Sequence, residues 1–232
     1  MRARYPIAAL GVLICAALAF LAAVSQPESA APDPVPPVLQ PPDRIAAGAS
    51  LALLGNCMTC HTAPEGSAYA GGRALSTPFG TVYSTNITPD PDTGIGRWSR
   101  EAFVRAMREG VERTGRHLYP AFPYDHFRKL EDGDLSALYA FIMTREPISA
   151  HPPPNELAFP FNLRPLIAVW KLLFLGDEPD TPPAGRSAEF DRGAYLVQSL
   201  AHCGGCHTPR NLLGAEKRDR ALAGGFSEGW RA

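Results

Sequence analysis

The alternation of hydrophobic and polar positions predicts a chain built mainly from helices. Small and apolar residues dominate 44–54, which predicts a helix, and Ser99 is placed to cap a second helix in which Phe103, Met107 and Val111 recur at a spacing of four. A closing helix is predicted over "EDGDLSALYAFIMT" at 131–144, where apolar residues share one face. The Gly/Pro/Thr-rich stretch 64–97 and residues 115–128 are expected to be loops.

The second half of the chain restarts the pattern of the first. "DRIAAGASLALLGNCMTCHT" at 43–62 and "DRGAYLVQSLAHCGGCHT" at 191–208 each give a helix, one cysteine–histidine motif and a later Gly-rich loop. Self-similarity of this kind predicts two copies of one structural unit. The second copy has 26 residues after Cys206, which leaves no room for the two later helices of the first. We therefore expect a partial second domain.

The link between the two copies is proline-rich and contains one apolar segment, Leu163–Leu175. This segment is shorter than the roughly 20 residues that a membrane-spanning helix needs. It also contains Arg164, Pro165 and Lys171. We expect a packed helix or a surface that faces a partner.

The N-terminal region differs in character from the rest. Arg2 and Arg4 precede an apolar run over 7–24, which lies between a signal peptide and a membrane anchor in length. We expect 1–26 to be one or the other, and 27–43 to be an extended Pro-rich linker. The remainder of the chain is then expected on the periplasmic side of the cytoplasmic membrane, with membrane association. The formal net charge of −1 gives no indication of nucleic-acid binding.

Four of the five cysteines lie in two copies of a Cys-x-x-Cys-His motif, at Cys57, Cys60, Cys203 and Cys206. In this arrangement the two thiols form thioether bonds to a haem, and the next histidine binds its iron from the proximal side. The motifs therefore predict covalent haem c, with His61 and His207 as iron ligands. Whether the shortened second unit retains its haem is left open.

Three other interpretations of the motifs compete with haem. A dithiol redox pair normally lies between a strand and a helix of an α/β domain, and no strand–helix alternation is predicted here. A single zinc site is disfavoured because the cysteine pairs are 146 residues apart and each has its own histidine. Structural disulfides are the third alternative. Haem c explains why a histidine directly follows the second cysteine in both copies.

The sixth iron ligand of the first haem is predicted less directly. In many such domains it is a methionine from the loop before the closing helix, but that loop reads "LYPAFPYDHF" and holds no methionine. Met107 and Met143 are placed as core residues. We select His126, with His117 or an open coordination position as alternatives. Arg73, Arg97, Trp98, Tyr83 and Asn86 are further candidates for the haem surroundings.

From about residue 44 onwards the chain resembles the multi-haem cytochrome c subunits of bacterial membrane-bound dehydrogenases. The resemblance is carried by "CMTCHT", "GGRALSTPFGTVYSTNITPDPDTGIGRWS", "LYPAFPYDHF", "NELAFPFNLRPL" and "RGAYLVQSLAHCGGCHTPRN". The chain differs from such proteins in two respects: several have a methionine where Phe122 stands, and here no third motif follows.

The resemblance implies a mainly α fold, with a cytochrome c-like domain at 44–146, a crossing segment at 147–186 and a partial cytochrome c-like domain at 187–232. It also implies electron transfer without substrate chemistry of its own. The donor would be the catalytic subunit of a dehydrogenase acting on alcohols, sugars, aldehydes or N-heterocycles, and the acceptor a quinone or terminal oxidase. The alternative function is that of a haem protein with an open distal site, either peroxidase-like or gas-binding.

Overall fold

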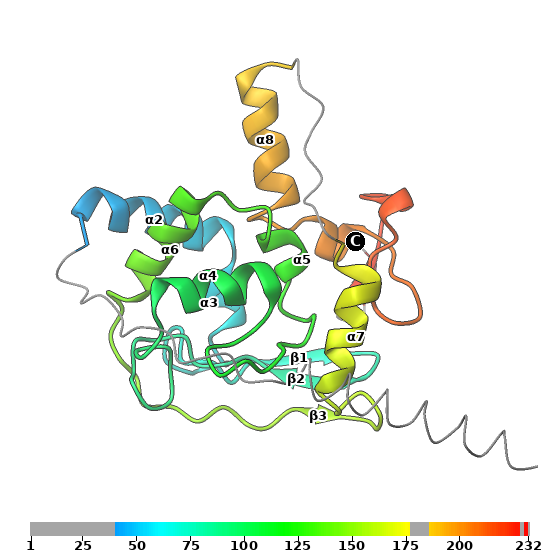
Figure 1. Ribbon diagram of the computed structural model, residues 1–232, viewed down its shortest axis with the longest axis horizontal. Helices are drawn as coiled ribbons and strands as arrows, with labels where there is room; N and C mark the ends of the chain where they lie inside the picture. Colours follow the sequence, from blue (N-terminus) through cyan, green and yellow to red (C-terminus); the bar gives the residue numbers. More distant parts are fainter. Residues whose placement is uncertain (1–39, 177–185, 228–229, 232) are drawn as a thin grey trace, which may run out of the picture.

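The computed structural model describes residues 40–176, 186–227 and 230–231, and in these segments the fold is mainly α (Figure 1). The expected leader at 1–26 and most of the linker at 27–43 lie outside the described residues. The helices are α2 Pro42–Leu54, α3 Cys57–Cys60, α4 Arg100–Glu109, α5 Tyr124–Phe127, α6 Asp132–Ile142, α7 Pro165–Phe174, α8 Ala188–Gln198, α9 Gly204–His207 and the 3-10 helix η2 Arg218–Arg220. The strands are β1 Ala74–Thr77, β2 Gly80–Tyr83, β3 Glu156–Leu157, β4 Phe226–Ser227 and β5 Trp230–Arg231.

The core of the first unit, α2 to α6, is built where α2 crosses the closing helix α6 (Figure 1). Helix α2 buries Leu51 and Ala52, and α6 buries Leu135 and Leu138. The two backbones approach closely at Gly48, where a Cβ would lie 2.0 Å from the carbonyl oxygen of Ala137. The glycine thus permits a crossing that any side chain would obstruct.

Helix α4 confirms the helix predicted from Ser99. The Ser99 hydroxyl accepts a hydrogen bond from the Ala102 amide at 3.1 Å, and this N-cap fixes where the helix begins. Phe103 and Met107 are buried in the core, as their spacing predicts. The helix ends at Glu109 because Gly110 adopts a left-handed conformation with φ of 61°. Val111 therefore lies beyond the helix that its spacing suggested.

Two stretches expected to be loops contain regular structure. Residues 74–83 form the antiparallel hairpin β1–β2, and β3 pairs with β2 through Gly80–Leu157 and Thr81–Glu156. Helix α5 lies within 115–128. Strands β1 and β2 have only four residues each, so the Gly and Pro residues nearby outweighed the weak strand signal of Thr, Val and Tyr.

The apolar segment Leu163–Leu175 forms helix α7, which packs against the first unit with Ile167 and Ala168 buried. Lys171 Nζ donates to the carbonyls of Glu109 and Gly110 at the end of α4. Leu172 and Leu173 remain exposed on the other side. Throughout 40–176, 186–227 and 230–231, no helix combines the length and apolar character needed to cross a bilayer.

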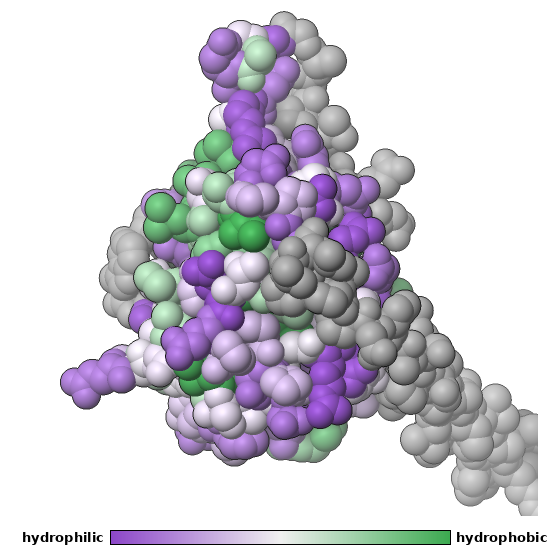
Figure 2. Space-filling view, turned by 90° about the vertical axis from the view of Figure 1, so that its left-hand side faces the viewer, coloured by the Kyte–Doolittle hydropathy of each residue, from purple (hydrophilic) through white to green (hydrophobic). Residues whose placement is uncertain are grey.

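Helix α8 projects from the body of the molecule (Figure 1), and none of its residues is buried. Seen from the α2 side, hydrophobic surface lies beneath this projecting helix (Figure 2). The exposed large hydrophobic residues of α2 and α8 are Leu53, Leu54, Phe190 and Val197. Among the described residues, no helix packs on α8 in the way that α6 packs on α2.

Candidate functional site

The first cysteine–histidine motif is a single helical turn with the histidine directly after it. Helix α3 runs from Cys57 to Cys60, and the amide of His61 donates to the Cys57 carbonyl at 2.9 Å. Asn56 enters the turn in the left-handed conformation, with φ of 54°. Both cysteines are free thiols. Residues three apart on a helix share a face, so the two thiols can bond one planar group.

His61 is held in the tautomer that an iron ligand requires. Its Nδ1 lies 2.7 Å from the backbone carbonyl oxygen of Thr85. Because a carbonyl only accepts hydrogen bonds, Nδ1 carries the proton and Nε2 keeps its lone pair for a metal. Burial lowers the pKa of His61 below its ordinary value, and the hydrogen bond to Thr85 only partly opposes this shift. The imidazole is therefore neutral at neutral pH.

The loop that carries Thr85 is fixed by its neighbour Asn86. The Asn86 amide donates to the carbonyl of Ile148 at 2.7 Å and to the Thr93 hydroxyl at 3.0 Å. Its oxygen accepts from the amide of Thr88 at 2.9 Å. Asn86, a candidate for the haem surroundings, thus has an indirect role: it positions the carbonyl that orients His61.

The other candidates for the haem surroundings have structural contacts. Arg97 forms an exposed ion pair with Asp92 at 2.6 Å. Trp98 packs against the core, and its carbonyl accepts from the Tyr139 hydroxyl. The Arg73 amide donates to Ser84 Oγ, and the Tyr83 amide donates to Asn155 Oδ1.

The Cys57 thiol lies in a partly buried environment next to Cys60. Burial, together with the nearby Cys60, raises the pKa of Cys57 to about 12. A buried, protonated thiol next to a neutral histidine fits the donor set of covalent haem.

The second motif repeats the backbone of the first. His202 precedes Cys203 in a left-handed conformation with φ of 38°, as Asn56 precedes Cys57. Helix α9 then carries Cys206 and His207, and the amide of His207 donates to the Cys203 carbonyl at 3.0 Å. Two remote segments of the sequence have therefore adopted one conformation.

The repeat extends into the Gly-rich loops. The amide of Gly71 donates to the carbonyl of His61 at 2.8 Å, and that of Gly224 to the carbonyl of His207 at 2.9 Å. In both units the threonine after the histidine accepts a further backbone amide, since Thr62 accepts from Tyr69 and Thr208 from Leu222. A short hairpin follows each loop, β1–β2 in one unit and β4–β5 in the other.

The units differ in what surrounds the histidine. His61 is half-buried, whereas the His207 side chain is exposed. In the first unit the motif is held by the bond from His61 to the Thr85 carbonyl and by packing of Cys57 against the hydrophobic core. In the described part of the second unit, no later helix covers α8 and α9 after η2 and the β4–β5 hairpin.

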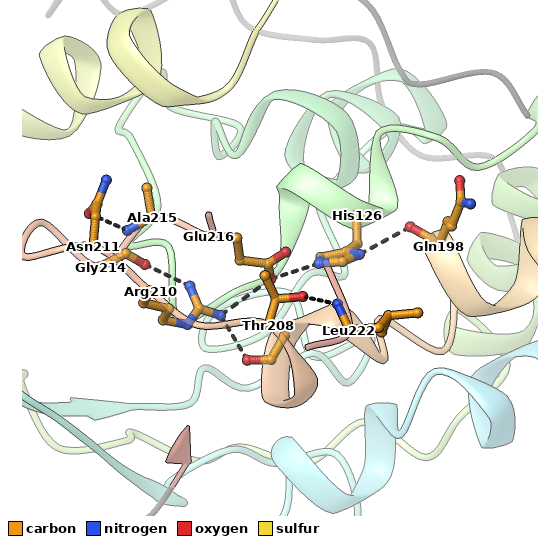
Figure 3. A network of polar contacts seen from close by, with 10 residues as sticks. His126, Gln198, Thr208, Arg210, Asn211, Gly214, Ala215, Glu216 and Leu222 are labelled. Carbon is orange, nitrogen blue, oxygen red and sulfur yellow. Dashed lines mark hydrogen bonds and ion pairs between the residues drawn. The ribbon is translucent and has the colours of Figure 1, made fainter. Parts of the chain in front are cut away.

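His126 lies at the junction of the two units (Figure 3). Its Nδ1 is 3.0 Å from the carbonyl of Gln198, and its Nε2 is 2.9 Å from Glu216 Oε1. Burial lowers the pKa of His126, but the hydrogen bond to Glu216 and the charges of Asp125 and Glu216 outweigh it, so the net shift is upward. To bind the first iron, His126 would have to give up one of these two bonds. Its assignment as that ligand stays a prediction.

The other side chains considered for the sixth position of the first iron also have contacts within the protein. His117 Nδ1 lies 3.0 Å from Lys171 Nζ. Met107 and Met143 are buried in the core, as predicted. Phe122, which stands where a methionine ligand would be expected, contacts two aromatic rings, with centroid distances of 5.3 Å to the tilted ring of Phe127 and 6.4 Å to the edge-on ring of Tyr124.

Sequence reasoning missed the residues that join the two motifs. The His202 ring lies edge-on to that of Phe127, with 5.6 Å between the ring centroids, and the Leu200 side chain reaches the backbone of Gly55. Leu200 is fully buried and belongs to the core of the first unit. The available signal was position, since Gly55 lies two residues before Cys57 and His202 directly before Cys203.

Comparison with known proteins identifies a family match and several related sequences. Residues 45–146 match the cytochrome c family. The chain is 57% identical to a nicotinate dehydrogenase subunit of Pseudomonas putida over 186 residues, which are 80% of this chain and 16% of that protein. It is 44% identical over 191 residues to the fructose dehydrogenase cytochrome subunit of Gluconobacter japonicus, covering 81% of this chain and 39% of the relative.

A third relative is a diheme cytochrome c-type protein of Cereibacter sphaeroides, which is 44% identical over 180 residues. That match covers 74% of this chain and 59% of the relative. The chain therefore spans less than two thirds of the length of each of these three proteins.

Proposed function

Since residues 45–146 belong to the cytochrome c family, we propose that this chain is an electron-transfer protein that carries haem c at both of its cysteine–histidine motifs. The observation that carries the proposal is the pairing of His61 Nδ1 with the Thr85 carbonyl, which leaves Nε2 free for iron. The haem supplies reversible one-electron chemistry at its iron when bound. The chain would attach the haem covalently, orient its histidine ligand and bury part of the group.

Each residue of the first motif has a defined task. Cys57 and Cys60 would attach the porphyrin, and the neutral imidazole of His61 would bind its iron. The Thr85 carbonyl fixes the ring of His61, and a hydrogen bond to the second ring nitrogen raises the basicity of a metal-bound histidine. Cys203, Cys206 and His207 would do the same in the second unit.

The contact between the motifs supports transfer inside one chain. Gly55 lies two residues before Cys57, and His202 lies directly before Cys203. The side chain of Leu200, three residues before Cys203, packs on the backbone of Gly55, where an added Cβ would lie 3.0 Å from Leu200 Cδ1, so the two attachment segments lie side by side. In this proposal the protein holds two redox centres close together and has no substrate chemistry of its own.

The relatives support a partner of a particular class. Several relatives are named as subunits of nicotinate, fructose, alcohol and gluconate dehydrogenases. We infer that this chain receives electrons from the catalytic subunit of such a dehydrogenase and delivers them to a quinone or terminal oxidase. The expected leader at 1–26 would bring it to the periplasmic side of the cytoplasmic membrane.

The test is the number of covalent haems per chain, measured by pyridine haemochrome absorbance after expression with c-type maturation. Two haems that are both reduced and reoxidised would support the relay. One haem would reduce the protein to a single-centre carrier, and none would refute the proposal.

A second candidate function rests on the distal side of the first haem. The three methionines of the described segments are either in the core, as Met107 and Met143 are, or in the motif itself, as Met58 is. Both ring nitrogens of His126 are engaged. An open sixth position would permit binding of a small molecule such as carbon monoxide or peroxide. Rapid carbon monoxide binding to the ferrous protein would support this function, whereas a low-spin six-coordinate iron in both oxidation states would refute it.

A further inference from the structure

His126 belongs to α5 of the first unit, yet its contacts are with the second. Its ring lies between the carbonyl of Gln198, at the end of α8, and the carboxylate of Glu216, which follows the second motif (Figure 3). Only 9% of its side chain is exposed, and 14% of that of Glu216. A buried pair of this kind constrains geometry strongly, because removing one partner leaves the other without compensation.

The ring of His126 also touches the helix that carries the second motif. A Cβ added to Gly204 would lie 2.8 Å from His126 Cε1 and 3.1 Å from Glu216 Oε2. A Cβ added to the neighbouring Gly205 would have no atom closer than His202 Nδ1 at 3.8 Å. The two glycines between Cys203 and Cys206 are therefore not equivalent. Gly204 is required by the approach of His126, whereas Gly205 has room for a methyl group.

Glu216 is connected to the same helix from the other side. Arg210 NH2 donates to the carbonyl of Gly205 at 3.0 Å and lies 3.5 Å from Glu216 Oε1. Arg210 NH1 donates to the carbonyl of Gly214 at 2.7 Å. The chain of contacts from His126 through Glu216 and Arg210 thus ends on the backbone of the second motif.

From these contacts we propose that the first unit forms one wall of the second haem-binding motif, and that His126 and Glu216 are the positioning pair that holds α9 in the conformation required for haem attachment. The proposal rests on the function proposed above for Cys203, Cys206 and His207. It gives His126 a role in the second site, distinct from ligation of the first iron. It also accounts for a second motif that keeps its form without a closing helix among the described residues.

The experiment uses the full chain, matured with haem, and the variants His126→Ala, Gly204→Ala, Gly205→Ala and the double variant His126→Ala/Gly204→Ala. Trypsin separates the motifs, because cleavage after Arg44 and Arg73 releases the first and cleavage after Arg192 and Arg210 releases the second. Mass spectrometry then gives the haem-bearing fraction of each peptide. Hydrogen exchange of the 193–210 segment is measured on the intact proteins as a readout that needs no haem in the second motif.

We expect His126→Ala and Gly204→Ala each to lower haem on peptide 193–210 by at least about twofold and to speed its exchange, because the first removes a buried contact and the second forces a methyl group against the His126 ring. Peptide 45–73 should keep its haem. Gly205→Ala should match the wild type. In the double variant Gly204→Ala should add no further loss, since the ring it would strike is gone.

Equal haem and exchange in His126→Ala and wild type would overturn the proposal, as would equal losses in Gly204→Ala and Gly205→Ala. A wild-type protein with haem on peptide 45–73 alone would instead refute the two-haem relay. In that event, faster hydrogen exchange of the 193–210 segment in His126→Ala but not in Gly205→Ala would still support contact of the first unit with the second motif. Unchanged exchange in His126→Ala would overturn the proposal.

Discussion

Leu200 packs directly on the backbone of Gly55, where an added Cβ would lie 3.0 Å from Leu200 Cδ1. Gly55 is followed within two residues by Cys57, and Leu200 is followed within three by Cys203. The core of the first unit thus includes a side chain of the second at the point where both motifs begin. An arrangement of this kind sets the separation of the two candidate haem sites through packing and not through the linker between them.

Truncation of Leu200 should therefore loosen the junction. Leu200 is completely buried, and Leu200→Ala is expected to lower the free energy of unfolding by about 2–5 kcal/mol, as large-to-small changes in cores do. Urea denaturation followed by far-UV circular dichroism measures this. Leu212→Ala is the control, since Leu212 is 96% exposed. An equal effect of the two substitutions would contradict the packing described.

The two units offer a second matched pair in their leading helices. Gly48→Ala places a methyl group 2.0 Å from the Ala137 carbonyl and is expected to lower the free energy of unfolding by about 2 kcal/mol or more. Gly193→Ala in α8 meets no atom within 4 Å, and should stabilise the helix by about 0.5–1 kcal/mol. The melting temperatures of both variants, compared with that of the wild type, test these two expectations. A destabilising Gly193→Ala would indicate that α8 is covered in solution.

Much of the fold can be predicted because it follows from local signals. Helices α2, α4 and α6 follow from apolar spacing and, for α4, from the Ser99 cap. The repeat can be detected because both copies carry the same cysteine–histidine motif and a later Gly-rich loop. In the structure each copy also has a left-handed residue before its first cysteine and a glycine amide that donates to the carbonyl of its histidine. Such features depend on a few neighbouring residues.

The junction between the units cannot be predicted in the same way. The sequence favours His126 as an iron ligand because it lies in the loop where a sixth ligand is expected. Its two hydrogen-bond partners, Gln198 and Glu216, are 72 and 90 residues away in sequence, and no periodicity reports on contacts at that separation. The role of Asn86 escapes prediction for a related reason, since the carbonyl that it positions belongs to Thr85 and backbone groups leave no trace in the sequence.

The assignment of the proximal ligands can be tested one haem at a time. In His61→Ala the haem should remain bound through Cys57 and Cys60, but its iron should lose an axial ligand. We expect the low-spin ferric signal in electron paramagnetic resonance to fall by about one haem per chain, with a high-spin signal in its place. His151→Ala, which changes an exposed residue, is the control. An unchanged low-spin signal in His61→Ala would refute the assignment.

The junction should also make stability depend on pH. The pKa of His126 is raised above its ordinary 6.5, because the bond to Glu216 and the charges of Asp125 and Glu216 outweigh the opposing effect of burial. Its contribution to folding is therefore complete below pH 6.5 and is lost as pH rises through the folded-state pKa. Asp125 acts in the same direction, since burial raises the pKa of its carboxyl and disfavours the charged form.

Glu216 sets the acid end of the pH range in which the junction is stable. Burial opposes its ionisation, but the hydrogen bond and charge of His126, with Arg210, lower its pKa below the ordinary 4.5. Its contribution is present above pH 4.5 and is lost as pH falls through the folded-state pKa. The junction should thus be most stable between about pH 4.5 and 6.5 and weaken towards alkaline pH. Melting temperatures of wild type and His126→Ala at intervals from pH 4 to 9 test this, because the difference between the two should shrink as pH rises. A difference that stays constant across that range would show that the pair is not charged in the folded protein.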